Sequence, residues 1–140
     1  MRLTSFTDYG LRALMRMAGT PDRALSTAEL AGGLRISRNH LTKIVQVLAR
    51  AGYVTTRRGG GGGAMLARPA GEIRLGDLVR LLEQGQALVE CFAEGGGTCA
   101  LTGDCRLKHR LHSAEESFLR DLNRSTLAQI AAPGRELVPG

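Results

Sequence analysis

A helical pattern over residues 38 to about 51 constrains the fold of this chain more than any other part of its sequence. Its apolar side chains recur at i, i+3, i+4 and i+7, so they share one face of a helix that must pack against a core. They are Leu41, Ile44, Val45 and Leu48. Ser37 directly precedes the pattern and can cap the helix. The opposite face is polar and basic, and carries Arg38, Asn39, Thr42, Lys43, Gln46 and Arg50.

A shorter helix is predicted immediately before this one. Ser26 or Thr27 can cap it, and Gly32 and Gly33 are expected to end it. A short helix, a tight turn and a longer helix with a basic N-terminal face are typical of a helix-turn-helix, whose second helix enters the major groove of DNA. An amphipathic helix with an ordinary solvated face would give the same pattern. Six residues are predicted to contact DNA here, namely Ser37, Arg38, Asn39, His40, Thr42 and Lys43.

The next segment predicts a β-hairpin with a glycine tip. Residues 53–56 are β-prone, five glycines occupy positions 59–63, and an extended apolar pattern resumes at residue 65. A loop without side chains can approach a phosphate backbone closely, and arginines at its base can pair with phosphate oxygens. The wing residues predicted to contact DNA are Arg57, Arg58, Gly60 and Gly61. A nucleotide-binding phosphate loop is the alternative, but no Gly-Lys-Ser/Thr follows the glycines and no helix begins at their end.

A further helix is predicted at the N-terminus. Ser5-Phe-Thr-Asp8 matches a capping box, and apolar residues follow at helical spacing from Gly10 to Ala18. Together these elements predict a mainly α fold. Residues 1–70 would form a winged helix-turn-helix DNA-binding domain with a small β-hairpin wing.

The charge is distributed in agreement with this division. Residues 1–70 carry a net charge of +8, whereas residues 71–140 carry −2. A basic half beside a mildly acidic half is expected when only one half meets a polyanion such as nucleic acid. A solvated, arginine-rich surface is the alternative.

The second half of the chain is predicted to hold a connecting helix, a loop, a long helix and a tail, over residues 71–88, 89–106, 107–132 and 133–140. The apolar pattern of the long helix starts near Arg106 and continues to Ala131. A domain this small has little core to cover both sides of such a helix, so we expect it to be a dimerisation helix that packs on a second copy. A two-fold homodimer would place two recognition helices ~34 Å apart, or a multiple of that, on a palindromic operator in double-stranded DNA.

Several classes of protein are disfavoured by composition. No run approaches the roughly 18 apolar residues that span a bilayer, and Arg2, Arg12 and Arg16 interrupt any apolar N-terminal block, so we expect a cytoplasmic protein without a membrane partner. The 3 histidines offer no evident nucleophile–base pair, so we expect no enzymatic activity. Three cysteines cannot all pair within one chain, which favours free thiols or metal ligation over a disulfide framework.

The three cysteines lie in one glycine-rich segment. Cys91, Cys99 and Cys105 are separated by seven and five residues, and such a loop can wrap one polynuclear centre. Thiolates select iron–sulfur clusters, zinc or Cu(I), and a fourth ligand would have to come from elsewhere. Zinc is an open alternative, because Cys105, His109 and His112 would share a helix face at i, i+4 and i+7. Three unmodified thiols are the other alternative.

These features together resemble the nitrite-sensitive repressors, the NsrR branch of the iron–sulfur winged-helix transcriptional regulators. The likeness covers residues 1 to about 131 and rests on the opening residues 1–14, the winged helix-turn-helix and the three-cysteine loop before a long helix. It implies a homodimeric DNA-binding repressor of nitric-oxide detoxification genes, whose cluster is destroyed or nitrosylated by nitric oxide. The cluster implied is [4Fe-4S], with [2Fe-2S] as the alternative.

The resemblance also implies roles for single residues. Cys91, Cys99 and Cys105 match the thiolate ligands, Asp8 of the partner subunit matches the fourth ligand, and Arg12 is placed to couple the cluster to the first helix. Without the resemblance, Asp8 would be explained by capping and the helix dipole. Two other functions stay open. One is an iron–sulfur electron-transfer protein, and the other is an iron–sulfur, zinc or metal-free winged-helix regulator that responds to another redox or metal signal.

Overall fold

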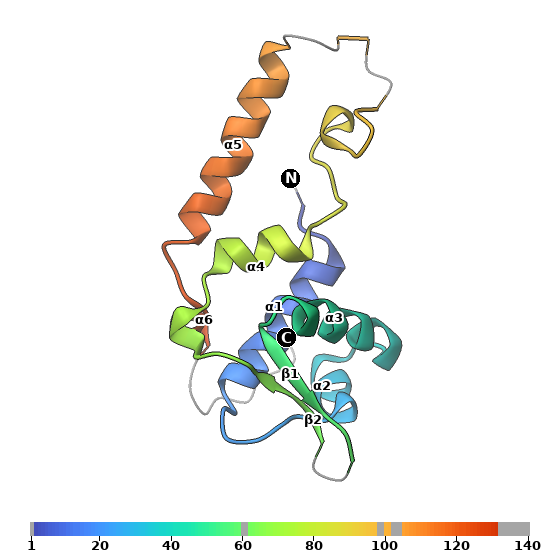
Figure 1. Cartoon of the computed structure of the whole chain (residues 1–140), viewed down its shortest axis with the longest axis vertical. Helices are drawn as coiled ribbons and strands as arrows, with labels where there is room; N and C mark the ends of the chain where they lie inside the picture. Colours follow the sequence, from blue (N-terminus) through green and yellow to red (C-terminus); the bar gives the residue numbers. More distant parts are fainter. Residues whose placement is uncertain (1, 60–61, 98–99, 102–104, 132–140) are drawn as a thin grey trace.

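The computed structural model describes residues 2–59, 62–97, 100–101 and 105–131 of the 140-residue chain. Its longer elements are α1 (Ser5–Ala18), α2 (Thr27–Leu34), α3 (Arg38–Arg50), β1 (Val54–Arg57), β2 (Gly63–Leu66), α4 (Leu75–Leu82), α5 (Arg106–Leu122) and α6 (Leu127–Ile130). Two short 3-10 turns, η1 (Ala70–Glu72) and η2 (Glu90–Phe92), complete them. The fold is mainly helical with a two-stranded antiparallel wing, which confirms the predicted fold class (Figure 1).

Figure 1 shows how these elements divide the molecule. Helices α1, α2 and α3 and the wing form one end, while α5 and the segment after α4 extend together away from it. Within the described residues, no helix is both long and apolar enough to cross a membrane.

Helix α1 packs between α3 and α4, and Gly10 makes this close approach possible. A Cβ at Gly10 would lie 2.9 Å from Cδ1 of Leu82 in α4 and 3.5 Å from Cγ2 of Ile44 in α3. Around this contact lies an aliphatic core whose innermost members are Leu14, Met17, Leu41, Ile44, Leu48 and Leu78. The recognition helix and the connecting helix are therefore both seated on α1.

The helix caps agree with the predicted ones at two of three positions. Ser26 and Ser37 cap α2 and α3, because their hydroxyl oxygens accept the backbone N–H groups of Glu29 and His40, each at 3.1 Å. At α1 the predicted capping box is one residue out of place. Thr4, rather than Ser5, is the N-cap, and its Oγ1 accepts the backbone N–H of Thr7 at 3.2 Å.

The predicted stop of α2 at two glycines is wrong. The helix continues through Gly32 and Gly33 to Leu34, and it ends because Arg35 adopts a left-handed conformation with φ 56° and ψ 45°. A glycine is tolerated inside a helix when the following residues continue its hydrogen bonds.

The wing has a simple register and a third contributor. Val54 pairs with Leu66 and Arg57 with Gly63, in antiparallel order. Leu25, in the connection before α2, exchanges two backbone hydrogen bonds with Ala64 of β2 at 2.8 and 2.9 Å. These bonds attach the wing to the helix-turn-helix, so the two predicted DNA-contacting parts form one unit.

The predicted single helix from residue 106 to 131 is interrupted. Helix α5 ends at Leu122, and the chain turns back so that Leu127 is fully buried in the core of the winged domain. The Asn123 side chain causes this end: its Oδ1 accepts the backbone N–H of Asp77, and its Nδ2 donates to Oδ1 of Asp77, both at 3.0 Å. Thr126 and Gln129 then form a capping box that starts α6.

Gly76→Ala should destabilise the protein by about 1–3 kcal/mol, because a Cβ there would collide with the backbone carbonyl of Leu119 and with the Asn123 side chain. Chemical denaturation of both variants measures this. Gly71→Ala is the matched control, since a Cβ at Gly71 meets nothing within 4 Å. Equal stability of the two variants would contradict the close crossing of α4 and α5.

Candidate nucleic-acid interface and cysteine segment

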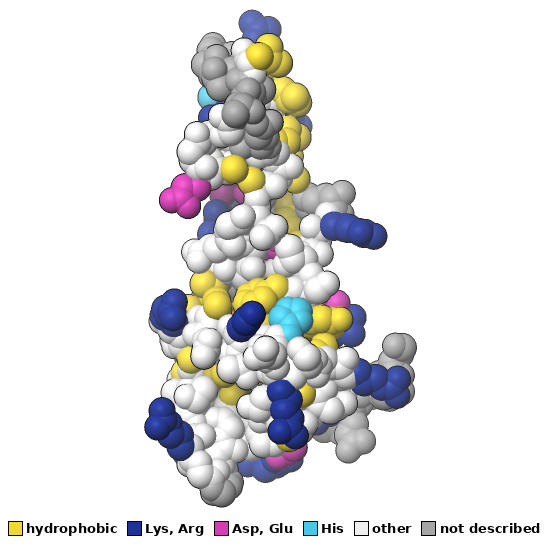
Figure 2. Space-filling view, turned by 90° about the vertical axis from the view of Figure 1, so that its right-hand side faces the viewer, with side chains coloured by type: hydrophobic (Ala, Val, Ile, Leu, Met, Phe, Trp, Pro, Cys, Tyr) yellow, Lys and Arg dark blue, Asp and Glu magenta, His cyan; other side chains and the backbone are white. Residues whose placement is uncertain are grey.

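The first turn of α3 offers an open polar and basic surface. Ser37, Arg38, Asn39, Thr42 and Lys43 are all exposed. The Thr42 hydroxyl donates to the carbonyl of Arg38 at 2.8 Å, so its oxygen is left to accept a hydrogen bond from a ligand. On the face drawn in Figure 2, Lys and Arg side chains are spread across the winged domain. This surface has the charge and the donor groups to meet the edge of a nucleic-acid groove.

His40 differs from its neighbours because its ring packs on α1. The ring is half-buried, with its centroid 5.9 Å from that of Phe6 and 5.4 Å from that of Tyr9, which it meets edge to face. The structure thus gives His40 a packing role that the sequence did not indicate. Aromatic residues three apart on α1 were the available signal, but periodicity cannot tell which helix they face. Contact of His40 with DNA stays a prediction.

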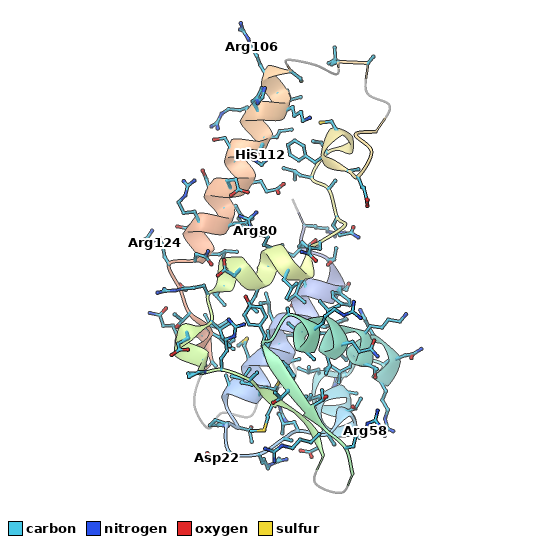
Figure 3. The ribbon with its side chains drawn as sticks, viewed as in Figure 1. Asp22, Arg58, Arg80, Arg106, His112 and Arg124 are labelled. Carbon is cyan, nitrogen blue, oxygen red and sulfur yellow. The ribbon has the colours of Figure 1, made fainter. Side chains whose placement is uncertain are left out.

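The wing presents its two arginines to solvent. Arg57 and Arg58 are exposed at the end of β1, and Figure 3 shows Arg58 near the tip of the hairpin. Gly60 and Gly61 lie outside the described residues. The sequence also missed Arg68, whose guanidinium carbon lies 4.4 Å from the centroid of the Tyr53 ring and whose Nε donates to the carbonyl of Gly52 at 3.3 Å. Arg68 therefore holds the base of the wing against the end of α3.

The cysteine segment, residues 91–105, lies beside the first turns of α5. Cys91 lies in η2, a short 3-10 turn where no regular structure was predicted, and Cys105 is the N-cap of α5. Both are half-buried, and Cys99 lies outside the described residues. Between them Gly95, Gly96 and Gly97 have φ of 87°, 74° and 64°, the conformations that the glycine-rich composition predicts.

Phe92 holds this segment against α5. Its ring meets the His112 ring edge-on with centroids 5.9 Å apart, and Figure 3 shows His112 on the side of α5 that faces the segment. A pocket of about 440 Å³ lies between the two parts, lined by Cys91, Phe92, Lys108, His109, His112 and Glu115. Among the residues that the structure describes, no three His, Cys, Asp or Glu side chains gather as a metal site would need, so the alternative zinc trio is not assembled.

The chemistry of the donors nevertheless suits an iron–sulfur cluster. Two half-buried thiols flank a left-handed glycine turn, and a third thiol, Cys99, follows that turn in the sequence. Soft thiolate donors on a backbone of this kind are what such clusters take.

Asp8 and Arg12 form an ion pair on α1. Nε of Arg12 donates to Oδ1 of Asp8 at 2.9 Å, and both side chains are about half exposed, at 53% and 49%. The guanidinium carbon of Arg12 also lies 6.0 Å from the centroid of the Tyr9 ring. The Asp8 carboxylate therefore lies at the surface and is connected to the aromatic contacts of His40.

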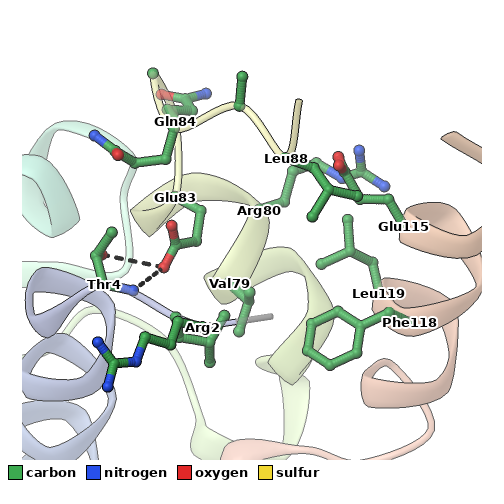
Figure 4. Close-up of a pocket in the computed structure, with 14 residues that line it drawn as sticks. Arg2, Thr4, Val79, Arg80, Glu83, Gln84, Leu88, Glu115, Phe118 and Leu119 are labelled. Atoms are coloured by element: carbon green, nitrogen blue, oxygen red, sulfur yellow. Dashed lines mark hydrogen bonds between the residues drawn. The ribbon is translucent and has the colours of Figure 1, made fainter. Parts of the chain in front are cut away.

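A second pocket, of about 470 Å³, lies between the N-terminal residues, the end of α4 and α5 (Figure 4). On one side of it, Oε1 of Glu83 accepts the Thr4 backbone N–H at 2.7 Å and the Thr4 hydroxyl at 3.1 Å. These bonds tie the end of α4, just before the cysteine segment, to the cap of α1. Sequence reasoning missed Glu83, because its partner is 79 positions away.

Across the α4–α5 crossing, Arg80 donates to both carboxylate oxygens of Glu116, at 3.0 and 2.9 Å. These hydrogen bonds lower the pKa of Glu116 and raise that of Arg80. The Arg80 side chain is 54% exposed and that of Glu116 is 34% exposed, so solvent screens the pair and its contribution to stability is modest.

Comparison with known proteins identifies a family and several solved structures that this chain resembles. The sequence profile of the Rrf2 family, described as an iron-dependent transcriptional regulator, matches residues 3–133. T. potens IscR is 25% identical with a TM-score of 0.72, over 93% of this chain and 85% of that one. The oxidized form of Staphylococcus aureus CymR is also 25% identical with a TM-score of 0.72, over 96% and 99%. CymR of B. subtilis, described as the global cysteine regulator, shares the fold at 23% identity, with a TM-score of 0.71 over 94% and 96%.

Glu116→Gln should remove an acid-sensitive part of the stability. The folded-state pKa of Glu116 lies below its ordinary 4.5, so the ion pair stabilises the fold above that value and is lost as pH falls through the lowered pKa. The difference in Tm between wild type and Glu116→Gln should therefore be present at neutral pH and shrink as the pH falls below 4.5 and through the lowered pKa of Glu116. Glu72→Gln is the control, since the exposed Glu72 side chain makes no hydrogen bond or ion pair within the described residues. A difference that is constant with pH would argue against the pair.

Proposed function

The chain belongs to the Rrf2 family of iron-dependent transcriptional regulators, and on this basis we propose that it is a homodimeric, DNA-binding repressor that senses nitric oxide through an iron–sulfur cluster. Transcriptional regulation and DNA binding are properties of the family. The observation that carries the DNA-binding part is the open, basic first turn of α3 beside the wing. Repression, dimerisation, the cluster and the signal are the proposal.

In the proposed complex, α3 enters the major groove. Arg38 and Asn39 present a guanidinium and a carboxamide, the groups that pair bidentately with guanine and adenine edges. Arg57 and Arg58 lie on the wing, where phosphate contacts would set the register of the domain on the duplex.

The cluster has a suitable donor set. Cys91, Cys99 and Cys105 of one protomer, with Asp8 of the partner subunit, would hold it. Both [4Fe-4S] and [2Fe-2S] clusters take four ligands, and we propose the [4Fe-4S] type on the resemblance to the nitrite-sensitive repressors. When bound, it would supply iron sites that react with nitric oxide. The family description as iron-dependent supports an iron centre.

Asp8 can act as a cluster ligand with only a small loss of folding free energy. An exposed i,i+4 ion pair contributes about 0.3–0.5 kcal/mol, so the carboxylate can leave Arg12 for a stronger partner. The position of Asp8 on α1 then matters, because that helix carries Tyr9 and Phe6 against His40.

These contacts connect Asp8 to the recognition helix. Arg12 pairs with Asp8 and lies over Tyr9, Tyr9 meets His40 edge-on, and the His40 backbone N–H bonds to the cap of α3. With Asp8 as a ligand in the partner's cysteine segment, α1 would be held to the neighbouring protomer, and α3, which packs on α1, would be placed with it. Binding that needs two half-sites at once is sensitive to this placement.

Exposed apolar surface supports the dimer. Leu107 in the first turn of α5 is 62% exposed and Leu101 is 70% exposed. Among the residues of α5, Leu119 is buried within the protomer, whereas most of the helix surface is open. Apolar side chains at the free end of a long helix favour an interface with a second copy.

Arg38→Ala should weaken operator binding by about 1–3 kcal/mol and reduce discrimination between operator and scrambled duplex. Arg58→Ala should instead weaken binding to both duplexes alike, because a phosphate contact carries no sequence information. Fluorescence anisotropy on an operator selected from a random duplex pool measures both. Unchanged discrimination by Arg38→Ala would remove it from the base-reading residues.

Nitric oxide should lower the operator affinity of the anaerobically reconstituted protein by roughly 5- to 150-fold, the range of allosteric coupling. A gel-shift titration before and after treatment measures this, and iron and acid-labile sulfide assays report the cluster itself. Asp8→Ala should bind the operator with a much smaller response, whereas Asp22→Ala, an exposed acidic control in the turn after α1, should respond as wild type. Equal affinity before and after nitric oxide would refute the sensing role, and colourless protein with zinc would refute the cluster.

A further inference from the structure

Arg35 occupies a backbone conformation that its side chain makes costly. Within the described part of the chain it is the one residue other than glycine with a positive φ, 56° with ψ 45°. In this left-handed region Cβ crowds the following carbonyl oxygen, so glycine is the residue of least strain there.

The helix-turn-helix itself imposes this conformation. The Arg35 N–H approaches the carbonyls of Ala31 and Gly32, and the Ile36 N–H bonds to the carbonyl of Ala31 at 3.1 Å. The Ile36 side chain then packs against the core, and Ser37 caps α3. A left-handed residue at position 35 is therefore needed to pass from α2 to α3.

Glycine is present in this segment, but at the wrong places for the backbone. A Cβ at Gly32 would meet nothing within 4 Å, and one at Gly33 would meet Arg16 atoms no closer than 3.5 Å, an ordinary contact. Neither position requires a glycine for space, and both lie inside α2. The backbone alone does not explain why the strained position carries an arginine in place of glycine.

That side chain does not stabilise the protomer through a polar contact. The Arg35 side chain is exposed, and its guanidinium makes no hydrogen bond or ion pair with the described residues. Other arginines of the winged domain do pair with carboxylates, Arg12 with Asp8 and Arg23 with Glu29. The guanidinium of Arg35 therefore keeps all its donors for a ligand outside the protomer.

We propose that Arg35 is a phosphate-binding residue that clamps the DNA backbone at the edge of the groove entered by α3. It lies two residues before the cap of that helix and three before Arg38, in the half of the chain whose net charge is +8. Its guanidinium offers the planar pair of N–H groups that matches a phosphate. This inference rests on DNA binding by the winged domain and adds a contact from the turn.

Arg35→Gly tests the proposal, because strain and binding predict opposite changes. Relief of the left-handed strain should raise Tm by about 2–4 °C. Loss of one phosphate contact per protomer should make the negative slope of log K against log salt concentration less steep, by about 1.8 for a dimer. It should also reduce the affinity for DNA roughly 10- to 30-fold at 0.15 M salt. The loss should be equal on operator and scrambled duplexes, since phosphates carry no sequence.

Three further variants test whether the change in salt dependence comes from the charge at position 35. Arg35→Lys should restore most of the salt slope, and Arg35→Asn, which tolerates the left-handed region, should bind as weakly as Arg35→Gly. Arg106→Gln removes the same charge at the end of α5 away from the winged domain (Figure 3) and should leave the slope unchanged.

Wild-type salt dependence in Arg35→Gly would overturn this proposal alone, and so would a lowered Tm, since that would mean a structural role. A normal slope with lost repression in cells would point to an acidic protein partner and would also overturn it. Wild-type protein that fails to bind any duplex would overturn both this inference and the proposed function.

Discussion

The packing of α1 between α3 and α4 is the contact on which the rest of the molecule depends. Gly10 has no side chain, so the side chains of Leu82 and Ile44 both come close to its backbone. A Cβ at this position would lie 2.9 Å from Cδ1 of Leu82, so the end of that side chain would have to move. A displacement of α1 would therefore disturb its packing against both α3, the recognition helix, and α4, the connecting helix.

The polar contacts of α1 follow the same geometry. At its N-terminus Glu83 accepts two hydrogen bonds from Thr4, which ties the cap of α1 to the residues that lead into the cysteine segment. One turn later Asp8 and Arg12 face solvent, and their aromatic neighbours contact His40. A helix with a rigid apolar side and an exchangeable polar side is suited to a switch, because weak surface pairs can change partners while the core stays packed.

Much of the winged domain could be predicted from local pattern. The caps at Ser26 and Ser37, the stripe from Leu41 to Leu48 and the hairpin around the glycine run all depend on residues within a few positions of one another. The candidate site was predicted less completely. Arg38 and the wing arginines are exposed as expected, but the ring contacts of His40, the anchor at Arg68 and the bond of Glu83 to Thr4 join residues distant in the sequence. Periodicity identifies the face of a helix, whereas the partner of that face comes from the fold.

The sequence by itself determined the order of the longer helices and strands as far as the start of α5, the basic character of the first half and the grouping of three thiols, because these are properties of composition and short-range spacing. Only the tertiary structure decided where α5 ends, since Asn123 leaves the helix to bond with Asp77, 46 positions earlier. It also decided that α2 runs through two glycines and stops at Arg35, because the stop depends on Ile36 reaching the core. Local propensities are small free energies, and burial of a side chain or satisfaction of a backbone group elsewhere in the fold outweighs them.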